Sequence, residues 1–322
     1  MSEPGATGRI SVVVPVYNGA ATLDELVQRI DAVLDGRHEI VLVNDGSADA
    51  SWPQIARIAS ERPHVRGLDL ARNFGQHNAL LAGIRAARGD VIVTLDDDLQ
   101  NPPEEIPKLL ARLDEGFDVV YGTPNARQYT WWRDTAARLV RLSLRSSMGG
   151  IADSVGPFRA LRTSLRDAFA TFSGPYVSID VLLGWTTSRF SSVEVEHLER
   201  RSGPSTYSFA KLASLALTML TGFSTRPLRI ASLLGLLSTL LGLIVLVYVL
   251  VRLAVEGNPV PGFPFLAAMI AIFSGAQLLT LGIIGEYLGR VHVRTMDRPA
   301  YAIREQVGGD GRAVSTPPDA PS

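Results

Sequence analysis

Short apolar runs alternate with amphipathic stretches of about a dozen residues through the first part of the chain, from residue 9 to residue 125. The apolar runs predict β-strands at Ile10–Val16, Glu39–Asn44, Val65–Leu70, Val91–Leu95 and Val119–Tyr121. The amphipathic stretches predict helices near residues 22–34, 50–61, 77–87 and 104–114. Strands that alternate with helices form a mainly parallel α/β sheet, which binds its ligands beyond the carboxyl ends of the strands.

The pattern changes after Pro227, where charged residues disappear from two long stretches. Ile230–Val251 and Phe263–Gly285 contain no charged residue, and each has about the 20 residues that a helix needs to cross a bilayer. We therefore expect two transmembrane helices. A hydrophobic helical hairpin buried in a core is the alternative, but helices of soluble proteins rarely run this far without a polar face.

Basic residues around these stretches predict their orientation. The segment between them, residues 256–262, has no Lys or Arg. Arg252 stands at the far end of the first stretch, but the other flanking basic residues lie on the outer sides, at Arg226, Arg229, Arg290, Arg294 and Arg298. Because cytoplasmic loops carry an excess of positive charge, both ends of the chain are predicted to be cytoplasmic. We expect a multi-pass protein of the cytoplasmic, or inner, membrane.

The polar N-terminus does not resemble a secretory signal, so residues 1–225 should stay on the cytoplasmic side. Residues 207–223 are apolar apart from Lys211 and predict a helix at the membrane interface, with a buried core helix as the alternative. The expected organisation is a catalytic domain at 1–206, an interfacial helix at 207–226, a transmembrane anchor at 227–290 and a cytoplasmic tail at 291–322. The end of this tail, from Val307, has a disordered composition.

Composition removes several classes of function. The net charge is −1 and no long basic stretch occurs, so nucleic acid is not expected as a partner. The absence of cysteine excludes disulfides, thiolate metal sites and a cysteine nucleophile. A dinucleotide oxidoreductase is disfavoured, because no G-x-G-x-x-G follows the first strand. The chemistry must rest on carboxylates, histidines and hydroxyl groups.

Polar residues follow three of the predicted strands. Asp96, Asp97 and Asp98 come after the strand GDVIV, and Asp96 and Asp98 could converge on one hard cation, which prefers oxygen ligands. Tyr17 and Asn18 end the first strand, and Asp45 ends the second. Side chains at these ends should meet in one crevice, where a cation could hold the diphosphate of a nucleotide-sugar. A solvated loop for the acidic run, and a helix cap for Asp45, remain as alternatives.

Four ordered motifs carry a family resemblance: VPVYN, VNDGS, LARNFGQHNALLAGI and TLDDDLQNPPEEIP. They resemble the inverting family-2 glycosyltransferases with a GT-A fold. More narrowly, the chain resembles the polyprenyl-phosphate glycosyltransferases over about residues 9–305. This group includes dolichyl-phosphate mannose synthases, bacterial lipid-phosphate glucosyltransferases and undecaprenyl-phosphate formamido-arabinose transferases. The resemblance implies transfer of a sugar from a nucleotide-sugar to a polyprenyl phosphate in the bilayer.

The resemblance also implies roles for the residues at the strand ends. The nucleotide-binding residues would be Pro15, Tyr17, Asn18, Asp45 and Asp96. A Mg²⁺ or Mn²⁺ ion would be held by Asp96, Asp98 and Gln100, with Asp98 also serving in catalysis. Asp97 stands where the family usually has a small residue, so the resemblance leaves its role open, with a solvent-facing side chain as the plain alternative.

Two later segments resemble acceptor-site motifs of the family. In IADSVGPFR, Asp153 would be a catalytic or acceptor-site carboxylate, and Arg159 would bind phosphate. In RRSGPSTYS, Arg200 and Ser205 would contact phosphates, although Thr206 replaces a basic residue. Surface loops are the plain alternative for both segments. His77, at a predicted helix start, is expected to have a structural or pocket-lining role.

The acceptor's own ionisation bears on the mechanism. A phosphate monoester has its second pKa near 6, so the lipid phosphate is already largely ionised at neutral pH and needs no strong general base. We expect direct displacement at the anomeric carbon with inversion, and a UDP-linked donor. A processive polysaccharide synthase and a non-catalytic membrane partner of glycan assembly are the alternatives. The sequence does not define the sugar or the oligomeric state, and a homo-oligomer stays open.

Overall fold

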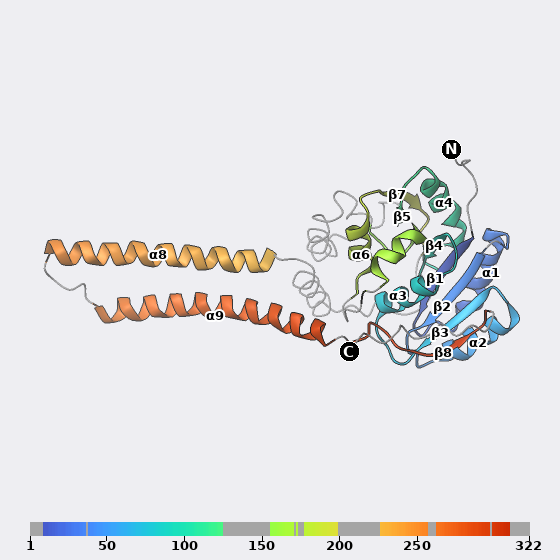
Figure 1. The fold of residues 1–322 in the computed structure, drawn as a ribbon, viewed down its shortest axis with the longest axis horizontal. Helices are drawn as coiled ribbons and strands as arrows, with labels where there is room; N and C mark the ends of the chain where they lie inside the picture. The colour runs from blue at the N-terminus through green and yellow to red at the C-terminus, as the bar shows by residue number, and fades with distance from the viewer. Residues whose placement is uncertain are drawn as a thin grey trace. The chain divides into compact units, whose positions relative to one another are not determined.

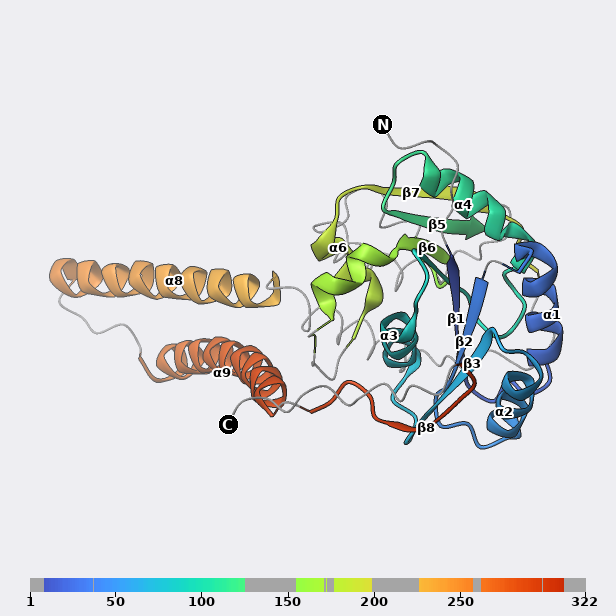
Figure 2. The same cartoon turned by 45° about the vertical axis from the view of Figure 1, so that its right-hand side comes forward.

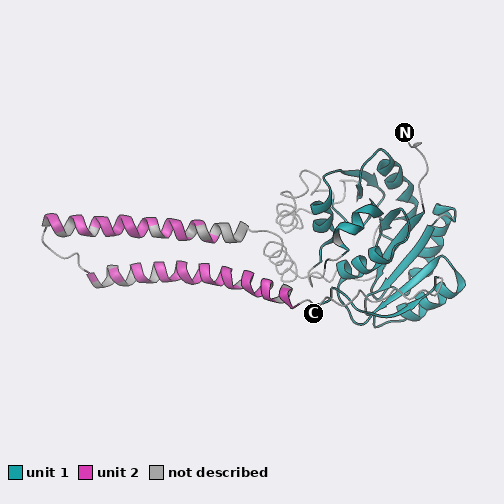
Figure 3. Ribbon diagram, viewed as in Figure 1, with its two compact units in different colours: residues 1–207, 297–322 teal, residues 208–296 magenta. Residues whose placement is uncertain are grey.

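The computed structural model describes residues 9–36, 38–124, 155–170, 172, 177–198, 226–256, 262–296 and 298–309. The chain divides into two compact units (Figure 3). The first unit comprises residues 1–207 and 297–322, and the second comprises residues 208–296. The first unit therefore contains chain segments from both sides of the second.

One sheet of eight strands organises the first unit (Figure 1). The order of the strands across the sheet is β7-β5-β6-β4-β1-β2-β3-β8. The strands are β1 Ile10–Val16, β2 His38–Asn44, β3 Val65–Leu70, β4 Val91–Thr94, β5 Val119–Pro124, β6 Arg159–Arg162, β7 Phe190–Val195 and β8 Ile303–Val307. Strands β3, β2, β1 and β4 run parallel to one another, so their carboxyl ends lie at one edge.

Helices cover both faces of the parallel part of this sheet (Figure 2). On one side lie α1 Leu23–Leu34 and α2 Ser51–Glu61, and on the other lie α3 Gln76–Ala86 and α6 Ile179–Thr186. The short helix η1 Pro103–Glu105 leads into α4 Ile106–Asp114, which packs on β5, β6 and β7, and η4 Thr163–Phe169 follows β6. Because both faces are covered, the central strands are continuous apolar runs, and all seven residues of β1 are buried.

The predicted mixed α/β class with a central, mainly parallel sheet is confirmed. Its mainly parallel part is interrupted by β6, which runs antiparallel to β4 and β5. The other antiparallel strand, β8, lies at the edge next to β3. It comes from the segment after the last helix, which the sequence pattern suggested to be a tail.

Two long helices make up the described part of the second unit: α8 Arg226–Glu256, of 31 residues, and α9 Gly262–Thr295, of 34 residues. They contact each other closely where Gly242 faces the Phe273 ring, since a Cβ at Gly242 would lie 2.8 Å from Phe273 Cζ. Among the residues that the structure describes, no helix combines the length and the apolar composition needed to cross a membrane.

Candidate active site

The carboxyl end of β1 is fixed to the loop after β2 by Asn18. The backbone N–H of Asn18 donates to Ser47 Oγ at 3.0 Å, and the N–H of Ala48 donates to Asn18 Oδ1 at 2.9 Å. Asn18 has a φ of 55°, a left-handed conformation that asparagine tolerates better than most residues. Tyr17, beside it, is 55% exposed, so its ring is accessible at the mouth of the site. Pro15 lies within β1 and is buried.

Asp45 follows β2 and supports the loop that follows β3. Its Oδ1 accepts from the N–H of Phe74 at 2.7 Å, and its Oδ2 accepts from the N–H of Gly75 at 2.9 Å. Burial raises the pKa of the Asp45 carboxyl, and the two N–H donors partly offset that rise. Both carboxylate oxygens are thus engaged by backbone groups, and the residue holds two strand ends together.

The helix-cap alternative for Asp45 does not describe the structure. The N-cap position of α2 is Ala50, and the N–H of Ser51 donates to Asp49 Oδ1 at 3.0 Å. A glycine is needed at position 46, because its φ is 64° and because a Cβ there would lie 2.5 Å from the backbone nitrogen of Asn73. The two loops are therefore packed backbone against backbone.

Asp96, after β4, lies among like charges. Its Oδ1 accepts from Gln76 Nε2 at 2.6 Å, which places the start of α3 against the acidic loop. The pKa of Asp96 is raised to about 7, because the carboxyl is buried and faces the charges of Asp98 and Asp97, while Arg159 and Gln76 oppose the rise. A group of carboxylates that repel one another is relieved when a divalent cation binds between them.

Asp97, whose role the sequence leaves open, does not simply face solvent. Its Oδ2 accepts from the backbone N–H of Tyr17 at 3.2 Å. The same oxygen occupies the space where Gly19 has no side chain, so that a Cβ at Gly19 would overlap it. Asp97 therefore joins the carboxyl ends of β4 and β1, and Gly19 makes room for this contact.

The rest of the acidic loop is held by its own turn and by the segment after β7. Leu99 has a left-handed φ of 58°, and the N–H of Gln100 donates to Asp98 Oδ1 at 3.1 Å. The Gln100 carbonyl accepts from the N–H of Leu198 at 2.9 Å. Asp96, Asp98 and Gln100, the predicted metal ligands, thus share one short loop at the carboxyl edge of the sheet.

Arg159, which the resemblance suggested as a phosphate ligand, lies in the core of the first unit. It is 1% exposed, and its guanidinium pairs with Asp180 and donates through Nε to Thr94 Oγ1 at 3.1 Å. Asp180 Oδ1 also accepts from the Tyr121 hydroxyl at 3.0 Å. Arg159 therefore acts from beneath the acidic loop, where its charge lowers the pKa of Asp96.

His77 lies in the same buried layer. Its Nδ1 accepts from the backbone N–H of Ile179 at 3.4 Å, and burial lowers its pKa. A neutral ring that accepts at Nδ1 carries its hydrogen on Nε2. This contact joins α3 to α6, in keeping with the structural role expected for His77.

The predicted residues Asp153, Arg200 and Ser205 lie outside the described part of the chain. Sequence reasoning missed Gln76 and Asp180, which contact Asp96 and Arg159. Gln76 stands in the conspicuous segment NFGQHN, but neither residue has a spacing that reveals its partner, since the contacts join separate elements.

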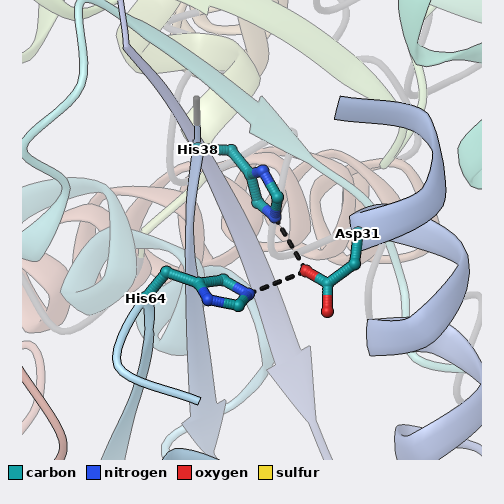
Figure 4. Close-up of side chains that lie close together, drawn as sticks. All are labelled: Asp31, His38 and His64. Atoms are coloured by element: carbon teal, nitrogen blue, oxygen red, sulfur yellow. Dashed lines mark hydrogen bonds and ion pairs between the residues drawn. The ribbon is translucent and has the colours of Figure 1, made fainter. Parts of the chain in front are cut away.

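A second group of titratable side chains lies at the opposite, amino ends of β2 and β3 (Figure 4). Asp31 Oδ1 is 2.9 Å from His38 Nε2 and 2.7 Å from His64 Nε2, and Arg62 donates to its other oxygen at 2.8 Å. His38 Nδ1 is buried and has no hydrogen-bond partner among the described residues. A cation on Nε2 would force a hydrogen onto this Nδ1, so hydrogen bonding to Asp31 is the favoured arrangement.

The part of the chain that carries the strand-end loops matches a known protein family. Residues 11–169 match the family described as Glycosyl transferase family 2. The chain belongs to this family and is a glycosyltransferase.

Relatives match nearly the whole chain. It is 39% identical over 315 residues to the undecaprenyl-phosphate 4-deoxy-4-formamido-L-arabinose transferase of Enterobacter sp. (strain 638), covering 95% of this chain and 96% of the relative. The corresponding transferase of Proteus mirabilis (strain HI4320) is 38% identical, with 96% and 97% covered. The resemblance to polyprenyl-phosphate glycosyltransferases is confirmed.

Solved structures also match the chain. Glucosyl-3-phosphoglycerate synthase from Mycobacterium tuberculosis, in complex with Mn²⁺ and uridine-diphosphate-glucose, is 21% identical with a TM-score of 0.48. The match covers 67% of this chain and 78% of that one.

Proposed function

We propose that the protein transfers a sugar, with inversion, from a UDP-linked donor to a polyprenyl phosphate such as undecaprenyl or decaprenyl phosphate. The observation that carries this proposal is the convergence of Tyr17, the Asp45 loop and the acidic loop at one sheet edge. It occurs in a chain whose relatives are undecaprenyl-phosphate transferases along nearly their full length.

A divalent cation, Mg²⁺ or Mn²⁺, would bind at Asp96, Asp98 and Gln100. The residues fit such an ion, because their oxygens are hard ligands, and because desolvation and the charges of Asp98 and Asp97 raise the pKa of Asp96. When bound, the cation offsets the charge that develops on the leaving nucleoside diphosphate. Tyr17, exposed beside this loop, is suited to stack on the base.

Two described residues that flank the segments of Asp153 and Arg200 in the sequence contact β4 and the acidic loop. Thr94, at the end of β4, donates through Oγ1 to the Pro157 carbonyl at 2.6 Å, four residues after Asp153. Leu198, two residues before Arg200, donates to the Gln100 carbonyl at 2.9 Å. These contacts support roles for Asp153 in orienting the acceptor, and for Arg200 and Ser205 in holding phosphates.

The reaction needs little proton transfer. An oxygen of the ionised lipid phosphate attacks the anomeric carbon, and the bond from that carbon to the nucleoside diphosphate breaks with its electron pair leaving on the diphosphate oxygen. The protein's task is to place two anions in line and to offset their repulsion. Gln76 donates to Asp96, and buried Arg159 donates to Thr94 at the end of β4, so both support the strand end that carries the acidic loop.

The helices α8 and α9 would anchor the site at the bilayer. Many of their large apolar side chains are more than half exposed, among them Leu236 at 62% and Leu278 at 69%. Strand β8, after α9, belongs to the same sheet as the strands before α8, so the chain must return to the side that it left. Two membrane crossings, one by α8 and one by α9, would return the chain to that side. A third span at 207–226 would not, so the same condition favours an interfacial helix there.

Metal-dependent donor binding provides the first test. The full-length protein in detergent would be screened by thermal shift against UDP- and GDP-sugars, with Mg²⁺, Mn²⁺ or a chelator. The proposal expects a UDP-sugar to raise the melting temperature only when a divalent cation is present. Binding of nucleotide-sugars that is equally strong in chelator would contradict the metal role.

A further inference from the structure

The chain that returns from the helical hairpin completes the sheet next to the candidate active site. Strand β8 pairs antiparallel with β3, and the N–H of Ala71 donates to the Ala302 carbonyl at 2.8 Å. Trp52 Nε1, on α2, donates to Glu305 Oε2 at 3.2 Å. This segment is therefore attached to both the β3 strand and the helix before it.

Arg304, in β8, contacts Asp69 and Ala71 at the carboxyl end of β3. Its Nη1 lies 3.3 Å from Asp69 Oδ2, and its Nη2 donates to the Ala71 carbonyl. The Asp69 side chain is only 3% exposed, whereas that of Arg304 is 60% exposed. A buried carboxylate needs such a counter-charge, because removal of its ionic partner leaves a desolvated charge behind.

From Asp69 a series of hydrogen bonds continues to the nucleotide loops. Asn44 Nδ2 donates to Asp69 Oδ1 at 2.7 Å, and the N–H of Ser47 donates to Asn44 Oδ1 at 3.3 Å. Ser47 Oγ in turn accepts from the N–H of Asn18 at 3.0 Å. Arg304 is thus connected, through the side chains of Asp69, Asn44 and Ser47, to Asn18 in the loop after β1.

The second contact of Arg304 leads to the loop after β3. Ala71 immediately precedes residues 72–75, whose backbone packs on Gly46 and donates from Phe74 and Gly75 to Asp45. The following residue, Gln76, donates to Asp96. Both contacts of Arg304 therefore converge on loops that form the candidate donor site.

We propose that Arg304 is a positioning residue for the nucleotide-sugar: the strand that returns from the hairpin supports the donor pocket through Asp69 and Ala71. This inference rests on the proposed function, since it assumes that the strand-end loops bind the donor. Arg304 touches neither reactant in this account. It keeps Asn18, Asp45 and Gln76 in the arrangement that the donor meets.

The test compares Arg304→Gln and Arg304→Lys with wild-type protein, all full length in detergent. Arg298→Gln, which removes the same charge from an exposed position of the same segment, is the matched control. Initial rates would be measured against UDP-sugar and against polyprenyl phosphate separately, together with melting temperatures and calorimetric UDP affinity. Arg304→Gln should raise the donor KM and the UDP Kd roughly tenfold, as loss of a supporting contact behind binding residues often does.

The same variant should leave the acceptor KM and the kcat at saturating donor close to wild type. Arg304→Lys, which keeps a cation at Asp69, should recover part of the donor affinity, and Arg298→Gln should change nothing. A lower kcat with an unchanged donor KM and UDP Kd would indicate only a smaller folded fraction and would overturn the inference. If wild-type protein bound no nucleotide-sugar, the proposed function would fail, and the inference with it.

Discussion

Asp96 has a raised pKa of about 7 because its carboxyl group is buried beside Asp98 and Asp97. A group whose folded-state pKa lies above its ordinary value of 3.8 binds a proton more readily in the folded state. In the metal-free protein, the contribution of Asp96 to the free energy of unfolding should therefore fall as the pH rises between about 4 and 7, and it should stay low above that window. The proposed cation, bound at these carboxylates, would offset their repulsion.

Replacing this carboxyl by an amide gives a direct prediction. Asp96→Asn should stabilise the metal-free protein at pH 8 by roughly 2 kcal/mol, with little effect at pH 4, because it removes only the charged form. Urea unfolding with a chelator present, at both pH values, measures the difference. With saturating Mn²⁺ the order should reverse, since the variant loses a metal ligand. Equal stability of the two proteins at pH 8 would contradict the account of Asp96.

The contact between Gly19 and Asp97 gives a second prediction at the same scale. Gly19→Ala should cost about 1–3 kcal/mol of unfolding free energy, because its methyl group overlaps the Asp97 carboxylate. Asp97→Ala alone loses the contact to the Tyr17 N–H. In the double variant the methyl group introduced at position 19 no longer meets a carboxylate, so the overlap is gone. A double-mutant cycle should therefore show a total cost smaller than the sum of the single costs. Strict additivity would mean that the two positions do not meet.

Residues that end apolar strands could be predicted as site residues, but the contacts that support them could not. Asp45 and Asp96 each follow a run of buried aliphatic residues, and parallel strands bring such ends together. Their supporting partners come from other elements: Asp69 lies 25 residues from Asn44, and Arg304 lies 235 residues from Asp69. No local pattern encodes such pairs. Arg159 shows the converse, because its motif suggested phosphate binding while Asp180 holds it in the core.

At the scale of elements, β8 joins the part of the chain after the hairpin to the sheet. A strand of five residues whose sequence is IREQV has too little alternation to be recognised, and its partner is remote. The parallel strands and their helices were predictable because each is a longer buried run or an amphipathic stretch. Because β8 pairs with β3, a deletion that removes α8, α9 and also the residues after them should disturb the sheet.

Two deletions should therefore behave differently. Removing residues 226–322 takes away β8 and leaves the edge of β3 and the Asp69 carboxylate without their partners, so this variant should bind UDP-sugar poorly or fail to fold. Replacing residues 226–296 by a flexible Gly/Ser linker keeps β8 and should preserve donor binding. Thermal shift with UDP-sugar and Mn²⁺ compares the two. Equal donor binding by both deletions would show that β8 has no such role.

At the scale of the whole molecule, the proposed membrane anchor should cross the bilayer an even number of times. Strand β8 and strands β1 to β7 share one sheet, so the chain must return to the side from which α8 departs. The distribution of arginines predicts that this side is the cytoplasm. The loop at 257–261 should then face outward.

The absence of native cysteine allows this orientation to be tested by labelling. Asn258→Cys, in the loop between the helices, should react with a membrane-impermeant maleimide in intact cells or spheroplasts. Asp24→Cys, at an exposed position of α1, should react only after lysis. The opposite labelling pattern would reverse the orientation, and labelling of both sites in intact cells would contradict the double crossing.

The central claim is that the acidic loop directs transfer of a sugar to a lipid phosphate. Its most direct test is the mass of the lipid formed when full-length protein, Mn²⁺, a UDP-sugar identified by thermal shift and polyprenyl phosphate are incubated together. The account predicts that the lipid gains the mass of one sugar residue, and that folded Asp98→Ala protein forms at least about 100-fold less of it. An unchanged yield from folded Asp98→Ala, or wild-type protein that binds the donor but leaves the lipid unmodified, would contradict it.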